Sequence, residues 1–67
     1  MTPVHFSEVN AIYKGEGLVE DLPALRKDGN VISRWRPSYE ELQTLCNGGA
    51  VEIAIAGGQP AIAVGVV

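Results

Sequence analysis

The most regular pattern of apolar and polar positions lies at the C-terminal end of the chain. Residues 50–56 and 61–67 alternate in side-chain size from one position to the next, and the run Gly57-Gly58-Gln59-Pro60 separates them. Alternation at every second position has the period of a β-strand, and glycine and proline between two such runs mark a turn. The sequence therefore predicts a C-terminal β-hairpin.

The two faces of this hairpin differ in size more than in polarity. One face carries the bulky side chains of Val51, Ile53, Ile55, Ile62, Val64 and Val66, and we expect it to pack against a helix. The other face carries Ala50, Glu52, Ala54, Ala56, Ala61, Ala63, Gly65 and Val67. Because an exposed antiparallel face is normally polar, the small face predicts covering by a second subunit or approach of a ligand. The alternative is that alanine and glycine are simply tolerated there.

A second strand–turn–strand pattern occupies residues 22–36. Residues 22–26 and 31–36 flank Lys27-Asp28-Gly29-Asn30, and Asp28-Gly29 is a hairpin signal because glycine accepts the positive φ of a tight turn. Pro23 places the first strand at its start or at a sheet edge, and Pro37 ends the second strand.

The helix signal is strongest over residues 39–46. Ser38 and Glu41 have the spacing of a capping box, Leu42 and Leu45 lie on one side, and Asn47-Gly48-Gly49 supplies the stop. Glu40 and Glu41 are interpreted as cap and helix-dipole residues rather than as an acid/base pair.

The N-terminal third gives a weaker pattern. Residues 4–6 indicate a short extended segment, and Ser7 followed by Val9, Ile12 and Tyr13 predicts a one- or two-turn helix or an ordered loop, ending at Gly15 or Gly17. Residues 16–23 have the composition of a linker. Together these elements predict a single small α+β domain over residues 1–67: a small, mainly antiparallel sheet of two β-hairpins with one short helix between them.

Composition limits what such a chain can do. With 67 residues and 7.1 kDa it is too short for a barrel enzyme or a dinucleotide-binding fold. A chain of this length hides only roughly 60% of its unfolded surface, and one cysteine (Cys46) and one histidine (His5) allow neither an internal disulfide nor a closed zinc site. Self-association is the remaining means of stabilisation, so we expect a homo-oligomer.

No catalytic group is oriented by a second group in this sequence, so we expect neither an enzyme nor a cofactor. Cys46 is interpreted as a buried small hydrophobe. The net charge of −3 argues against coating of duplex DNA, and no apolar stretch approaches the roughly 20 residues of a membrane span. No secretory signal is visible, and a single reduced cysteine fits a cytoplasmic setting.

The negative total conceals a cationic window over residues 26–36. Four of the five cationic residues lie there against one acid, Asp28. Two arginines at alternate strand positions can capture a phosphate or carboxylate, and an aromatic neighbour can stack on a base. The candidate ligand-binding residues are Arg26, Ser33, Arg34, Trp35, Arg36 and Tyr39.

Each candidate has a structural alternative. For Trp35 the structural alternative is favoured, because it is the only tryptophan and the expected core aromatic of a chain short of large residues. The arginines alternatively form solvated ion pairs with acidic neighbours, namely Glu20, Asp21, Glu40 or Glu41.

Several short motifs resemble short uncharacterised accessory proteins of tailed bacteriophages and prophages. They are Phe6-x-x-x-Asn10, Leu22-Pro23, Asp28-Gly29, Ile32-Ser33-x-Trp35, Ser38-x-x-Glu41, Gly48-Gly49 and Gln59-Pro60. The resemblance implies a small accessory protein in the host bacterial cytoplasm. Such proteins often counter host defence, either by sequestering a nucleotide signal or by blocking a host protein. We therefore predict a non-enzymatic binding protein for a phosphate-bearing (nucleotide) signal; the alternatives are an inhibitor of a host protein and a minor virion structural protein.

Overall fold

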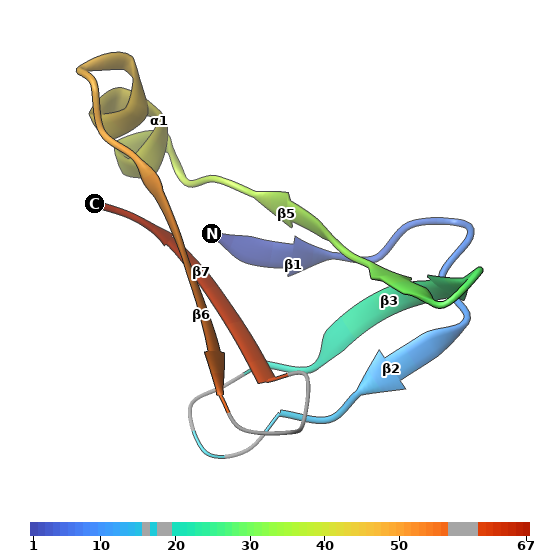
Figure 1. Ribbon diagram of the computed structural model, residues 1–67. Coiled ribbons are helices and arrows are strands. Elements are labelled where there is room, and N and C mark those ends of the chain that lie inside the picture. Colours follow the sequence, from blue (N-terminus) through green and yellow to red (C-terminus); the bar gives the residue numbers. More distant parts are fainter. Residues whose placement is uncertain (16, 18–19, 57–60) are drawn as a thin grey trace.

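The computed structural model describes residues 1–15, 17, 20–56 and 61–67. Within them the chain forms strands β1 (Thr2–Val4), β2 (Ala11–Tyr13), β3 (Leu22–Lys27), β4 (Asn30–Ile32) and β5 (Arg34–Arg36), helix α1 (Tyr39–Cys46), and strands β6 (Val51–Ala56) and β7 (Ala61–Val66), as Figure 1 shows. The predicted α+β class, with a helix between two antiparallel hairpins, is confirmed.

Over the described ranges the strands form three small antiparallel sheets. β1 pairs with β5, β3 lies between β2 and β4, and β6 pairs with β7. Val51 lies opposite Val66 and Ala56 opposite Ala61, so the register keeps the predicted bulky and small faces of the C-terminal hairpin apart. The Gln59-Pro60 motif of its turn falls outside the described residues.

The central hairpin is confirmed at its turn and differs in its second strand. Asp28 and Gly29 both have positive φ, at 53° and 79°, which is the geometry of a two-residue primed turn. The predicted strand over residues 31–36 is divided at Ser33, because β4 pairs with β3 whereas β5 leaves it to pair with β1. Pro23, the second residue of β3, lies on the half of that strand that pairs only with β2, which fits its predicted place.

Of the two alternatives predicted for the segment after Ser7, the one- or two-turn helix is wrong. Ser7 and Glu8 form a turn that the Val9 N–H closes on the Phe6 carbonyl at 3.1 Å, and β2 follows directly. One or two isolated helical turns are marginal in water, whereas β2 gains a ladder with β3. The extended segment expected at residues 4–6 lies earlier, as β1.

Helix α1 begins and ends as predicted. The Ser38 hydroxyl accepts from the Glu41 N–H at 3.1 Å, and the Glu41 carboxylate accepts from the Ser38 N–H at 2.8 Å. Gly48, with φ of 89°, follows the helix end. Cys46, predicted to be buried, is exposed, because α1 buries none of its residues. No helix among the described residues is long and apolar enough to cross a membrane.

The core is small and lies in the N-terminal half. Of the described residues, only Phe6, Leu22 and Ala24 are buried hydrophobics. The expectation that the bulky hairpin face packs against the helix is correct for one strand only. α1 lies against β7, whose Ile62, Val64 and Val66 are half-buried, while the bulky residues of β6 stay exposed.

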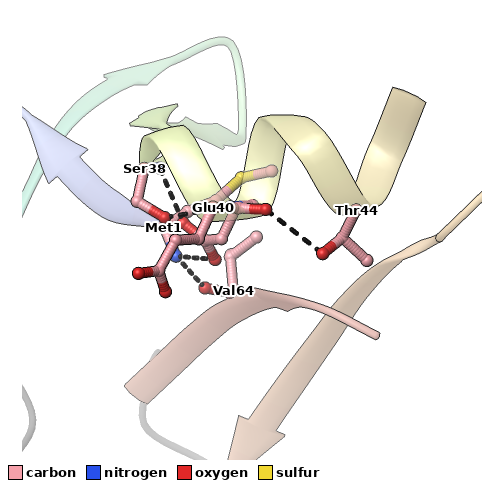
Figure 2. Close-up of polar contacts among 6 residues, drawn as sticks. Met1, Ser38, Glu40, Thr44 and Val64 are labelled. Atoms are coloured by element: carbon pink, nitrogen blue, oxygen red, sulfur yellow. Dashed lines mark hydrogen bonds and ion pairs between the residues drawn. The ribbon is translucent and has the colours of Figure 1, made fainter. Parts of the chain in front are cut away.

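Figure 2 shows how the N-terminus joins the C-terminal elements. The Met1 ammonium donates to the Glu41 carboxylate at 2.6 Å and to the Val64 carbonyl at 2.9 Å. One charged group thereby links β1, α1 and β7.

Candidate functional site

A concave surface that carries one predicted site residue, Arg26, lies beside the β3–β4 turn. This hollow, which we call the Arg26 hollow, has a volume of about 530 Å³. Its lining residues come from β2 and its approach and from the central hairpin: Asn10, Ala11, Tyr13, Arg26, Lys27, Asp28, Gly29, Asn30 and Val31. Two cations and one aromatic ring are thus brought to one place.

Asn10 fixes the backbone at the edge of this hollow. Its side-chain Oδ1 accepts from the Arg26 N–H at 2.7 Å, and its Nδ2 donates to the Arg26 carbonyl at 3.1 Å. The Asn10 N–H itself donates to the Ala24 carbonyl at 3.0 Å. Both backbone polar groups of Arg26 are therefore satisfied where the β2 main chain no longer reaches. These hydrogen bonds hold the backbone of Arg26 in place, and its side chain extends from there.

The cationic window does not form the ion pairs that the alternative interpretation requires. In the part of the chain that the structure describes, the ion pairs within 4.0 Å are those of the Met1 ammonium with Glu41 and of Lys14 with Asp21. Two of the four acids proposed as arginine partners are therefore engaged elsewhere. Arg26, Lys27, Arg34 and Arg36 have no such partner among these residues.

The engaged acids show the effect of their partners. The Gly15 N–H, at 3.0 Å, and the Lys14 ammonium, at 3.2 Å, lower the pKa of Asp21. The Met1 ammonium, followed by the Ser38 N–H, lowers the pKa of Glu41. Both carboxylates thus remain charged at neutral pH, without help from the arginines.

Arg34 has a different environment from Arg26. Its guanidinium lies over the Phe6 ring, 4.3 Å from the centroid, in a cation–π contact. The pKa of Glu8 is lowered most by hydrogen bonds from its own backbone N–H and from the Ser7 side chain, and the positive charge of Arg34 lowers it further. We interpret Arg34 mainly as a residue that covers the buried Phe6.

The other predicted site residues lie at three further places. Trp35, half-buried, donates from Nε1 to the Ser33 hydroxyl at 2.9 Å. It lines a separate groove of about 280 Å³ with Met1, Pro3, Ile62 and Val64 among its neighbours. Arg36, exposed at the end of β5, lies opposite Thr2. Tyr39 is 75% exposed at the start of α1, where its hydroxyl accepts from Gln43 at 2.9 Å.

The six predicted residues therefore do not converge on one pocket, and Arg26 alone lines the hollow. Sequence reasoning missed Asn10 and Tyr13 as lining residues, since both were assigned elsewhere: Asn10 only to a motif, Tyr13 to a helix. The run Ala11-Ile12-Tyr13 has two residues common in strands, but three residues are too few to reveal a strand.

Residues 1–15, 17, 20–56 and 61–67 hold no group of three or more His, Cys, Asp or Glu side chains suited to a metal ion. In comparisons with known proteins, no family model, no curated protein and no solved structure matches this chain.

Proposed function

We propose that this chain is a non-enzymatic binding protein that takes a small phosphate-bearing ligand in the Arg26 hollow. One observation carries the proposal: Arg26 and Lys27 line a hollow of about 530 Å³, and neither has an acidic partner within 4.0 Å among the described residues. Small-molecule sites commonly measure roughly 300–1,000 Å³, so a mononucleotide matches this volume.

The residues of the hollow supply complementary chemistry for such a ligand. The Arg26 guanidinium can donate two parallel hydrogen bonds to phosphate oxygens. Lys27 follows Arg26 on β3 and points to the opposite face, so its ammonium adds positive potential near the hollow rather than a second direct contact. Tyr13 offers a ring on which a base can stack. Asp28, which also lines the hollow, would repel a second phosphate group, which favours a ligand with few charges.

The biological setting is also part of the proposal. The resemblance to accessory proteins of tailed phages supports a role in the host bacterial cytoplasm, where a homo-oligomer would counter defence by sequestering a nucleotide signal. Sequestration needs binding at stoichiometric protein concentration and no chemistry, which suits a sequence whose spacing indicates no oriented acid/base pair.

Calorimetry with a panel of cyclic and linear nucleotides, and with inorganic phosphate, tests the site. Loss of charge-assisted hydrogen bonds in Arg26→Gln is expected to weaken nucleotide binding by at least roughly tenfold. Arg36→Gln removes the same charge outside the hollow, so its affinity should stay within about twofold of the native protein.

Two results contradict this assignment. The first is absence of heat with every nucleotide at protein concentrations well above micromolar. The second is an equal loss of nucleotide affinity in Arg26→Gln and Arg36→Gln, which would show that only the net charge of the protein matters.

The host-protein alternative is favoured by a different observation, the exposed apolar residues of β6. It predicts that counter-defence activity survives Arg26→Gln and is lost when β6 is altered. The ligand proposal predicts that Arg26→Gln abolishes this activity.

A further inference from the structure

The chain exposes more surface than a folded monomer of its mass normally does. Its accessible surface is 4970 Å², whereas the general scaling for 7.1 kDa gives about 4,100 Å². Its radius of gyration of 12.8 Å likewise exceeds the roughly 11 Å expected for 67 residues. The excess of about 900 Å² is close to the ~800 Å² that each partner buries in a standard interface.

Much of the exposed apolar area lies along β6. Val51, Ile53 and Ile55 are 49%, 62% and 69% exposed, and all three point to the bulky face. β6 contains one charged residue, Glu52, and no proline, so it lacks most of the features that protect an edge strand from pairing.

The hydrogen bonds of the hairpin show which backbone groups of β6 point outward. Ala50 and Val67 exchange both of their backbone hydrogen bonds, each at 2.9 Å. Because such pairs alternate along an antiparallel ladder, residues 52, 54 and 56 also point toward β7. The N–H and C=O groups of Val51, Ile53 and Ile55 therefore point away from it.

The two edges of the hairpin are treated differently. By the same alternation the Val64 carbonyl lies on the outer edge of β7, and there it accepts from the Met1 ammonium. In the described part of the chain β6 pairs with β7 alone, as Figure 1 shows. Across the described ranges, the outward groups of β6 have no backbone partner.

We propose that β6 pairs antiparallel with β6 of a second copy of this chain, across a two-fold axis at Ile53. In this arrangement Ile53 faces the partner's Ile53, and Val51 faces the partner's Ile55. All three outward residues then exchange backbone hydrogen bonds, and the two hairpins become one four-stranded sheet. The exposed Val51, Ile53 and Ile55 of both copies form one continuous apolar row.

Neighbouring registers are less favourable. An axis at Glu52 would place two carboxylates directly opposite each other, and an axis at Ala54 would carry Val51 past the end of the partner's strand. Registers with an odd offset would set bulky side chains on the small face. With the axis at Ile53, Glu52 lies opposite the partner's Ala54, and the two-fold symmetry closes the edge.

Opposite charges at Ala54 test this pairing, because Ala54 is exposed and accepts a long side chain. Ala54→Lys should place an ammonium opposite the partner's Glu52, and Ala54→Glu a second carboxylate. We expect the dimer dissociation constant, measured by sedimentation equilibrium, to be at least about tenfold larger for Ala54→Glu than for Ala54→Lys. Ala63→Lys and Ala63→Glu, one strand farther from the axis, should differ little from each other.

Cysteine pairing tests the register. In a Cys46→Ser background, Ile53→Cys should give a disulfide-linked dimer under mild oxidation, since paired α-carbons lie about 5.5 Å apart. Glu52→Cys and Ala54→Cys should cross-link more slowly, because each faces a different residue. Circular dichroism of every variant confirms that the hairpin is folded.

Three results overturn the proposal. They are a native protein that stays monomeric at roughly millimolar concentration, equal dissociation by both Ala54 variants, and fastest cross-linking at Glu52 or Ala54. Equal dissociation would place the interface on the small face, as the sequence pattern alone suggests. This interface supplies the homo-oligomer of the proposed function but needs no ligand. Sedimentation therefore tests the dimer and nucleotide calorimetry tests the ligand site, and either proposal can be contradicted without the other.

Discussion

The side-chain amide of Asn10 takes the place of a peptide group at the beginning of β2. It donates to and accepts from the backbone of Arg26, as the next residue of a longer strand would. The main chain between the buried Phe6 and Asn10 can therefore form a turn instead of pairing with β3. The backbone groups of Arg26 in β3 still have hydrogen-bond partners. A single polar side chain thereby completes the backbone hydrogen bonds of Arg26 at the edge of the Arg26 hollow.

Removal of this amide should lower stability. Asn10→Ala leaves the Arg26 N–H and C=O to solvent, and we expect a loss of about 1 kcal/mol in the free energy of unfolding. Urea titration at fixed protein concentration measures it. Asn30→Ala is the matched control, since none of the described side-chain hydrogen bonds involves Asn30. Equal losses in the two variants would show that the amide bridge contributes nothing specific.

At the scale of elements, local signals predicted local structure. The capping box at Ser38 and Glu41 and the turn at Asp28-Gly29 are formed by residues within four positions of each other, so the sequence alone shows them. β2 depends on a partner strand eleven residues away, between Ile12 and Pro23, and its spacing alone resembled a helix.

The candidate site was harder to predict for the same reason. Sequence proximity suggested that Arg34, Trp35 and Tyr39 act together, but successive strand residues point to opposite faces and β5 changes its partner sheet after Ser33. The alternation of the C-terminal hairpin was predictable, and so was the bulky face that contacts α1, whereas the exposure of that face on β6 was not. Which of the two strands packs against the helix depends on tertiary contacts that no local pattern records.

The helix provides the prediction at this scale. Ser38→Ala removes the hydroxyl that accepts from the Glu41 N–H, and we expect α1 to lose about 1 kcal/mol. For a domain of this size that corresponds to a melting temperature roughly 4–8 °C lower, measured by circular dichroism. Ser38→Thr retains the acceptor and should melt within about 2 °C of the native protein. A Thr variant as unstable as the Ala variant would contradict the role of the hydroxyl.

At the scale of the whole molecule, three small sheets share a core of three buried side chains among the described residues, Phe6, Leu22 and Ala24. Few contacts therefore connect the N-terminal sheets to the helix and the C-terminal hairpin. The Met1 ammonium is one of them, because it contacts both the Glu41 carboxylate and the Val64 carbonyl (Figure 2). Such a charged link should make the stability of the entire fold depend on pH.

The direction of that dependence follows from Glu41. The Met1 ammonium and the Ser38 N–H lower its pKa in the folded chain below the unfolded value of 4.5. The unfolded chain therefore binds the proton more tightly, and the contribution of Glu41 is fully present above pH 4.5 and is lost as the pH falls through the folded pKa. The urea midpoints of the native protein and of Glu41→Gln, measured between about pH 2 and pH 7, should differ at neutral pH and converge in acid.

Glu40→Gln is the control. It removes a carboxylate that lies in the same helical turn but does not contact Met1, so the difference between its urea midpoint and that of the native protein should vary much less over this pH interval. A gap between native protein and Glu41→Gln that persists unchanged to pH 2 would mean that the carboxylate acts through its shape and its cap alone, and that its charge does not join the two halves of the molecule.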